Sequence, residues 1–183
     1  AWFAEVSQRT ARMIAQWLRV GFVHGVMNTD NLSVLGLTID YGPYGGVDNF
    51  DLAFTPNTTD RGGRYSFGNQ AQIGAWNLSC LAQALLPLVD DVDALQAALA
   101  KYPDAFVEAY LAVLRDKLGL PREGDKASDF ALVDALFACF SSFETDMTIF
   151  YRRLGHIAAA AHTPETAFAA LAPAFYTTPS PTA

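Results

Sequence analysis

The chain has 183 residues, of which 51% are hydrophobic and 17% are charged, so it has enough apolar material for a folded core and lacks the composition of a disordered protein. Its 12 basic and 19 acidic side chains give a formal net charge of −7, which argues against a nucleic-acid-binding protein. No uninterrupted apolar stretch of about eighteen residues is present, so no membrane-spanning helix is expected.

The first part of the chain predicts one helix, one hairpin and one long loop. Residues 3–20 place apolar side chains at roughly helical spacing, and Gly21 is suited to end that helix. Two short strand-like runs, 32–35 and 37–40, flank Gly36 and predict a tight β-hairpin. Residues 41–68 are rich in Gly, Pro, Asn and Asp, and we expect them to form a long ordered loop.

From Asn69 onward the apolar pattern is helical. The sequence predicts a mainly α fold with a small β-hairpin, in which Phe67 and Trp76 anchor the first helix of a bundle in the core. A charged linker over residues 121–129 separates two groups of helices. The expected helices run from about residue 69 to Pro87, over 92–102 and 103–118, from about 128 past Met147 to Leu154, and over 164–172.

Three polar side chains cluster around the predicted hairpin. Asp30 and Asn31 precede its first strand, and Asp40 ends its second strand. Because a tight turn brings the chain back on itself, Asn31 and Asp40 should lie side by side at the open end. Two hard oxygen ligands of this kind suit Mg²⁺, which completes its coordination with water and substrate phosphate. The alternative is that these side chains only shape turns.

The order of these residues follows that of protein kinases, which carry H-R-D-x-x-x-x-N and then D-F-G. His24 and Asn31 are seven residues apart, and Asp40-Tyr41-Gly42 stands where D-F-G would stand. The position of the usual catalytic aspartate holds Val26, which is typical of a pseudokinase. Asp30 is then the carboxylate in this loop that could replace it, and we expect His24 to brace the backbone.

Two longer segments carry a more specific resemblance. The chain resembles the selenoprotein O family, also called the YdiU family, in HGVMNTDNLSVLGLTIDYGP from His24 and in RYSFGNQAQIGAWNLSCLAQAL from Arg64. The likeness continues into DMTIFYRRL from Asp146 and covers roughly residues 2–155.

The resemblance implies a protein-kinase-like fold that works as a protein adenylyltransferase. Such an enzyme binds ATP in a flipped orientation, moves AMP onto hydroxyl side chains of Ser, Thr or Tyr in other proteins, and releases pyrophosphate. By resemblance, Asp30 is the proton acceptor, and Asn31 and Asp40 are the Mg²⁺ ligands, with Mn²⁺ as an alternative ion. Asp40 also lies at the ATP phosphates. The family's distribution implies a bacterial cytoplasm, or a mitochondrion in a eukaryote.

By resemblance, residues 1–155 form the C-terminal lobe of the kinase-like fold, with the catalytic loop at 22–31 and the metal-binding segment at 40–42. Residues 156–183 form a partly flexible C-terminal extension. The family's N-terminal lobe, with its glycine-rich loop, strand lysine and phosphate-binding arginines, is not within this sequence. We therefore expect that lobe to dock on this chain, and the isolated chain to be inactive and to bind ATP weakly or not at all.

Two other functions remain open from the residues alone. The same metal pair would serve a kinase-like phosphotransferase, and the loss of the usual aspartate would suit a catalytically silent nucleotide-binding pseudokinase. Arg61 and Arg64 could hold a phosphate or an acceptor peptide, or form a salt bridge that stabilises their loop.

Overall fold

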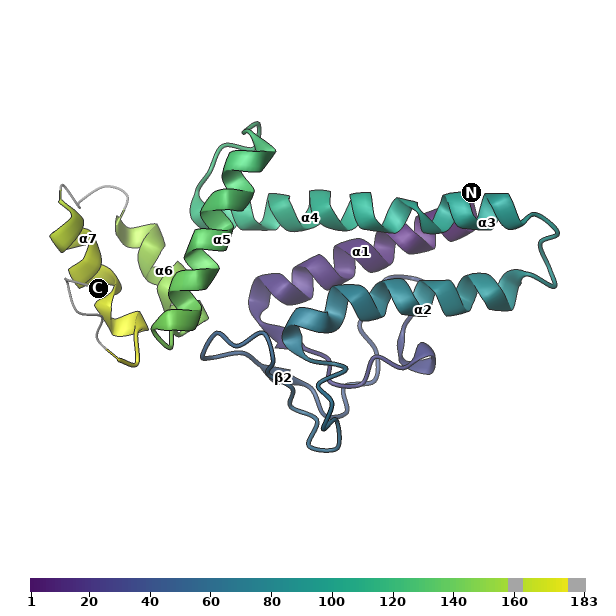
Figure 1. Cartoon of the computed structure of the whole chain (residues 1–183), viewed down its shortest axis with the longest axis horizontal. Coiled ribbons are helices and arrows are strands. Elements are labelled where there is room, and N and C mark those ends of the chain that lie inside the picture. Colours follow the sequence, from purple (N-terminus) through teal and green to yellow (C-terminus); the bar gives the residue numbers. More distant parts are fainter. Residues whose placement is uncertain (158–162, 178–183) are drawn as a thin grey trace. The chain divides into compact units, whose positions relative to one another are not determined.

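The structure of the chain is a computed structural model, and its described residues are 1–157 and 163–177. The chain is mainly helical in this part, with one small antiparallel sheet of two strands (Figure 1). The predicted C-terminal extension, residues 156–183, lies in part outside the described residues. No helix within the described residues is long and apolar enough to cross a membrane.

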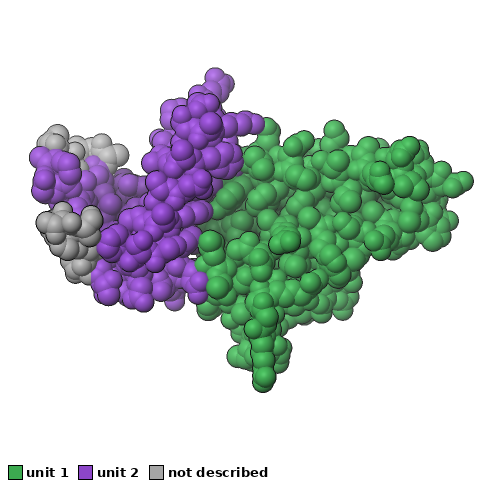
Figure 2. All heavy atoms as spheres, in the orientation of Figure 1, with its two compact units in different colours: residues 1–46, 52–110 green, residues 47–51, 111–183 purple. Residues whose placement is uncertain are grey.

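The chain divides into two compact units, which are coloured separately in Figure 2. Unit 1 consists of residues 1–46 and 52–110, and unit 2 consists of residues 47–51 and 111–183. Unit 1 contains every residue that the sequence singles out as a candidate for catalysis or metal binding.

Unit 1 is built on helix α1 (Trp2–Val20), which confirms the helix predicted over 3–20. Gly21 ends it in the left-handed conformation, with φ of 71°, and its N–H donates to carbonyls of the last turn, as is common for helix ends. Helices α2 (Gln70–Leu85) and α3 (Val92–Leu99) pack against α1. The core between them is formed by Phe3, Val6, Ala11, Met13, Ile14, Trp17, Met27, Ile73, Leu78, Leu95 and Tyr102.

The hairpin predicted over 32–40 is reduced to a single antiparallel bridge between Leu32 and Thr38. Thr38 is held by helix α1, because its hydroxyl accepts a hydrogen bond from the Trp17 indole at 2.8 Å. Leu35 and Leu37 are each 58% exposed, so a longer ladder here would bury little apolar surface.

The two-stranded sheet forms elsewhere in unit 1, between segments that the sequence places in loops. Strand β1 (Phe22–Val23) runs antiparallel to β2 (Gly45–Gly46), with Phe22 opposite Gly46 and Val23 opposite Gly45. The sheet thus joins the chain just before His24 to the chain just after the Asp40 segment.

Unit 2 contains α5 (Lys126–Ser142), α6 (Met147–Ile157) and α7 (Pro164–Leu171). Helix α4 (Lys101–Leu118) begins in unit 1 and contributes its residues from 111 onward to unit 2. The core of unit 2 includes Phe140, which is fully buried, and its ring centroid lies 5.3 Å from that of Phe50 and 4.7 Å from that of Phe150.

The prediction that one helix continues from about 128 to Leu154 is wrong. Residues 143–146 separate α5 from α6, because Thr145 bridges to Phe175 and Asp146 bridges to Asn49. These backbone partners come from distant segments of unit 2, so a local helical pattern could not reveal the break.

The charged linker after α4 is ordered by a buried arginine. Arg115, only 8% exposed, donates to the Asp129 carboxylate at 2.7 Å and to the carbonyls of Arg122 and Gly124 at 2.7 and 2.8 Å. One guanidinium therefore ties the end of α4, the linker and the start of α5 together, with its charge compensated by a carboxylate.

Close packing of α1 on α2 generates a first prediction. A Cβ atom at Gly74 would overlap the Ile14 Cδ1 atom and lie 2.7 Å from the Tyr102 hydroxyl, which itself donates to the Ala71 carbonyl. We expect Gly74→Ala to lower the free energy of unfolding by about 1–3 kcal/mol, because these side chains must move apart. Urea unfolding followed by far-UV circular dichroism measures the change.

Gly155→Ala is the matched control, since Gly155 also lies in a helix and has open space around the added carbon. It should raise stability by about 0.5–1 kcal/mol, because alanine favours a helix over glycine. A Gly74→Ala protein as stable as the parent would contradict the packing described for α1 and α2.

Candidate active site

The candidate site is centred on loop 24–31, which runs from His24 to Asn31. The His24 side chain is 1% exposed, and its Nε2 lies 2.8 Å from the Ile39 carbonyl. Its Nδ1 accepts a longer hydrogen bond, 3.4 Å, from the Val26 N–H. These partners place the ring proton on Nε2 and confirm that His24 braces the backbone. The residue it holds, Ile39, directly precedes Asp40.

Gln70, the first residue of α2, fixes the start of this loop. Its side chain is completely buried, its Oε1 accepts from the His24 N–H at 3.0 Å, and its Nε2 donates to the Phe22 carbonyl at 2.9 Å. One amide thus satisfies both a donor and an acceptor of the buried backbone around His24. Sequence analysis missed Gln70, because a polar residue at a helix start has no feature that shows it is buried.

Asparagine side chains hold the next part of the loop. Three of them donate to three consecutive carbonyls: Asn57 to Gly25 at 3.1 Å, Asn31 to Val26 at 3.0 Å, and Asn77 to Met27 at 2.9 Å. Because loop 24–31 is neither helix nor strand before Thr29, these side chains replace the backbone partners that regular structure would supply.

Gly25 allows the loop to approach the segment after Asp40. Its φ is +80°, and an added Cβ would lie 2.5 Å from the Pro43 carbonyl oxygen. Both the backbone conformation and the close approach therefore require glycine at this position.

The three predicted site residues lie on the same side of the antiparallel Leu32–Thr38 bridge, where the two chain segments diverge. Asp30 and Asn31 belong to the short 3₁₀-helix η1 (Thr29–Asn31), and Asp40 follows Thr38 by two residues. The bridge therefore keeps both chain segments adjacent where these side chains leave them.

The side-chain oxygens of these three residues make no contact with a hydrogen-bond donor or a cation in the part of the chain that the structure describes. The Asn31 amide nitrogen is used by the Val26 carbonyl, whereas its Oδ1 and the carboxylates of Asp30 and Asp40 have no hydrogen-bond or ion-pair partner among the described residues. Hard oxygen donors left without protein partners fit the ligand preference of Mg²⁺. No cluster of three or more His, Cys, Asp or Glu side chains suited to a metal occurs in the described ranges.

Asp40 has a strained backbone. Its φ is +54°, and its carbonyl accepts from the Gly42 N–H at 2.8 Å in a tight turn. A non-glycine residue in this region costs on the order of 1–3 kcal/mol and persists only where the surroundings impose it. The hydrogen bond from His24 to Ile39 is one such restraint.

Helix α2 differs from its prediction at Trp76. Phe67 is buried as expected, whereas Trp76 is 45% exposed, and the Arg64 guanidinium lies 4.5 Å from its ring centroid. The buried stripe of α2 consists of residues 70, 73, 74, 77 and 78, and Trp76 falls outside it. Arg64 has no ion-pair partner among the described residues, so the alternative of a salt bridge at this position is wrong.

Comparison with known proteins shows which family the sequence of this chain matches. The family model described as "Protein adenylyltransferase SelO" matches residues 1–174. Proteins described as "Protein nucleotidyltransferase YdiU" are similar to the chain. The one from Aromatoleum aromaticum is 56% identical over 157 residues, which cover 85% of this chain and 30% of the relative. The one from Rhodopirellula baltica is 52% identical over 158 residues, covering 86% and 29%. The chain thus spans about 30% of the length of these relatives.

The role of Gln70 generates a second prediction. In the Gln70→Ala protein, the His24 N–H and the Phe22 carbonyl lose their hydrogen-bond partner. We expect each of these two unsatisfied groups to lower the free energy of unfolding by about 1–3 kcal/mol. The same change should expose the His24 amide to hydrogen exchange, measured residue by residue by NMR. Gln72→Ala, at an exposed position of the same helix, is the control. Unchanged protection of the His24 amide in the Gln70→Ala protein would show that the hydrogen bond does not hold the loop.

Proposed function

Because the chain belongs to the family of SelO protein adenylyltransferases, we propose that it carries the catalytic-loop half of a site that moves AMP from ATP to hydroxyl side chains of proteins. The observation that supports this proposal is that the side-chain oxygens of Asp30, Asn31 and Asp40, at one end of a rigidly held loop, have no partner among residues 1–157 and 163–177. Side-chain oxygens that the protein itself does not use, on a loop held by other atoms, are suited to bind an ion and a substrate.

In the proposed site, Asn31 Oδ1 and the Asp40 carboxylate hold Mg²⁺, or Mn²⁺ in its place, at the ATP phosphates. The bound ion supplies charge neutralisation on those phosphates. Asp30 accepts the proton of the acceptor hydroxyl, whose oxygen forms a bond to the α-phosphorus while the bond to the β-phosphate oxygen breaks and pyrophosphate leaves. Because such chemistry depends on positioning, the fixed backbone between His24 and Asp40 contributes directly to the rate.

We propose a kinase-like fold for the complete protein, as the family resemblance implies. We assign residues 1–155 to its C-terminal lobe, with the catalytic loop at 22–31 and the metal-binding segment at 40–42, and residues 156–183 to an extension. Since the chain spans about 30% of its relatives, the N-terminal lobe that completes the nucleotide site would come from the remaining part of such a protein and dock on this one. The proposed setting is the bacterial cytoplasm.

Label transfer from ATP tests the reaction. The protein to use is the Aromatoleum aromaticum relative in which the 157 matched residues are replaced by those of this chain, with the unaltered relative as positive control. With Mg²⁺ and a protein acceptor, we expect label from α-labelled ATP to reach protein and label from γ-labelled ATP not to. Transfer from the γ position alone would make the protein a phosphotransferase, and ATP binding without any transfer would make it a pseudokinase.

Substitutions in the same assay test the residue roles. Asp40→Asn and Asp30→Asn should each lower kcat by about 10²–10⁴-fold, because one removes a charged ion ligand and the other the proton acceptor. Asp134→Asn, at an exposed position of α5, is the control for the loss of one acidic charge. Activity within twofold of the parent in the Asp30→Asn protein would remove Asp30 from the mechanism.

The isolated chain should bind Mg·ATP weakly or not at all, since the described residues supply two candidate ion ligands and no second lobe. Isothermal titration calorimetry of the 183-residue chain measures this directly. Binding as tight as that of the unaltered relative would show that the nucleotide site lies entirely within this chain.

A further inference from the structure

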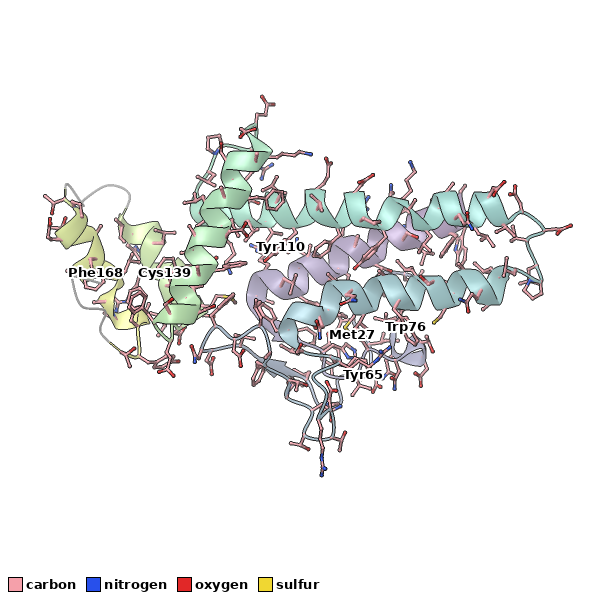
Figure 3. The ribbon with its side chains drawn as sticks, in the orientation of Figure 1. Met27, Tyr65, Trp76, Tyr110, Cys139 and Phe168 are labelled. Atoms are coloured by element: carbon pink, nitrogen blue, oxygen red, sulfur yellow. The ribbon has the colours of Figure 1, made fainter. Side chains whose placement is uncertain are left out.

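An exposed arginine–aromatic surface lies beside the candidate site, on residues that the proposed reaction does not use. The Arg64 guanidinium lies over the Trp76 ring at 4.5 Å and near the Tyr65 ring at 5.6 Å. Trp76 is 45% exposed. Tyr65 and Trp76 lie in the same part of unit 1 in Figure 3. We call Arg64, Tyr65 and Trp76 the Arg64 surface.

The Arg64 surface is held rigidly. The two carboxylate oxygens of Asp60 accept hydrogen bonds from the Arg64 and Tyr65 N–H groups at 2.9 and 2.8 Å, which fixes the backbone beneath both side chains. The guanidinium over the indole is attracted to the face of the ring, and its N–H donors lie at the edge of its own planar group. A binding group that is already ordered loses little entropy when a partner arrives.

This surface is also joined to the candidate catalytic loop. The Tyr65 hydroxyl donates to the Asn28 side-chain oxygen, and Asn28 precedes Asp30 by two residues. An acceptor segment that presents a hydroxyl to Asp30 therefore passes close to the Arg64 surface.

The charge of Arg64 is uncompensated within the described ranges. Arg9, Arg115 and Arg122 each have a carboxylate within 4.0 Å, and Arg64 has none among the described residues. In a chain of net charge −7, an exposed guanidinium without an acidic partner is available to a partner from another molecule. Its planar fork of donors matches the two oxygens of a carboxylate.

We propose that the Arg64 surface binds an acidic segment of the acceptor protein, in which an Asp or Glu carboxylate near the target hydroxyl pairs with Arg64. The adjoining backbone of that segment packs on the Trp76 and Tyr65 rings. This inference rests on the proposed function, since it names the kind of acceptor that the site selects. It also explains why Trp76 lies outside the core, because the Trp76 ring supports the Arg64 guanidinium that binds the acidic segment.

A binding titration tests the surface without any need for catalysis. The ¹⁵N-labelled 183-residue chain is titrated at low salt with a short peptide in which glutamates flank one serine, and with a matched peptide in which glutamines replace them. We expect the Trp76 indole N–H signal to shift with the glutamate peptide only, and high salt to abolish the shift, because exposed charge pairs are screened. Trp17, which is buried and bonded to Thr38, is the internal control.

Substitutions of Arg64 test whether this residue binds the glutamate peptide. Arg64→Ala should weaken binding of the glutamate peptide by about tenfold or more, the value of one charged hydrogen-bonded contact, and Arg64→Lys should fall between. Arg12→Ala removes the same charge from an exposed position on α1, outside the Arg64 surface, and should leave binding unchanged. Thermal unfolding of each variant checks that it remains folded.

The outcomes separate the proposal from its rivals. An equal response to both peptides, no response at Trp76, or unchanged binding by a folded Arg64→Ala protein would overturn it. A shift caused by inorganic triphosphate and not by the glutamate peptide would assign Arg64 to phosphate and overturn it as well. In the grafted protein, Arg64→Ala should raise KM for the glutamate peptide about tenfold and leave KM for ATP unchanged. If no transfer occurs at all, the proposed function fails while the titration still decides what the surface binds.

Discussion

A buried loop backbone must find hydrogen-bond partners, and in this protein side-chain amides supply them. His24 and Met27 are almost completely buried, yet the chain between them forms neither helix nor strand. An unpaired N–H or C=O group there would cost about as much as a lost hydrogen bond, and several would leave the loop without a single conformation. Gln70 and the asparagines at 31, 57 and 77 satisfy these groups, so the geometry of the candidate site depends on them.

This solution couples the site to the packing of the helices. Gln70 and Asn77 both belong to α2, and the same helix meets α1 at Gly74, where no side chain fits between them. A shift of α2 would therefore move the hydrogen-bond partners of the loop as well as the core. Among the described residues, the carboxylates of Asp30 and Asp40 and the Oδ1 of Asn31 have no partner, because the loop is held by other atoms, such as the His24 ring and the Asn31 amide nitrogen. Structural polar groups and candidate functional ones are thus separate sets of atoms.

Arg64 differs from Arg9, which also lies in unit 1, in the group that its guanidinium contacts. Elsewhere in the described part of unit 1, Arg9 pairs with Glu5 one helical turn away, which is an exposed contact of little energetic value. Arg64 instead lies over the Trp76 ring and has no carboxylate within 4.0 Å among the described residues. Stacking on Trp76 orders the guanidinium without neutralising it, which is the arrangement expected of a cation kept for an external anion.

Local patterns in the sequence are sufficient for most of the helices and for the order of the candidate site residues. The kinase-like order of His24, Asn31 and Asp40 stays a prediction, whereas the apolar spacing of residues 3–20 and the glycine after them predict α1 correctly. Such features depend on residues close together in the chain, so the sequence by itself determines them. Only the tertiary structure decided that the predicted hairpin is one bridge, that Trp76 is exposed, and that Gln70 holds His24 across 46 residues. Each of these outcomes depends on contacts between segments that are distant in sequence. Such contacts, rather than the local pattern, decide whether a polar amide is buried or an aromatic ring is exposed.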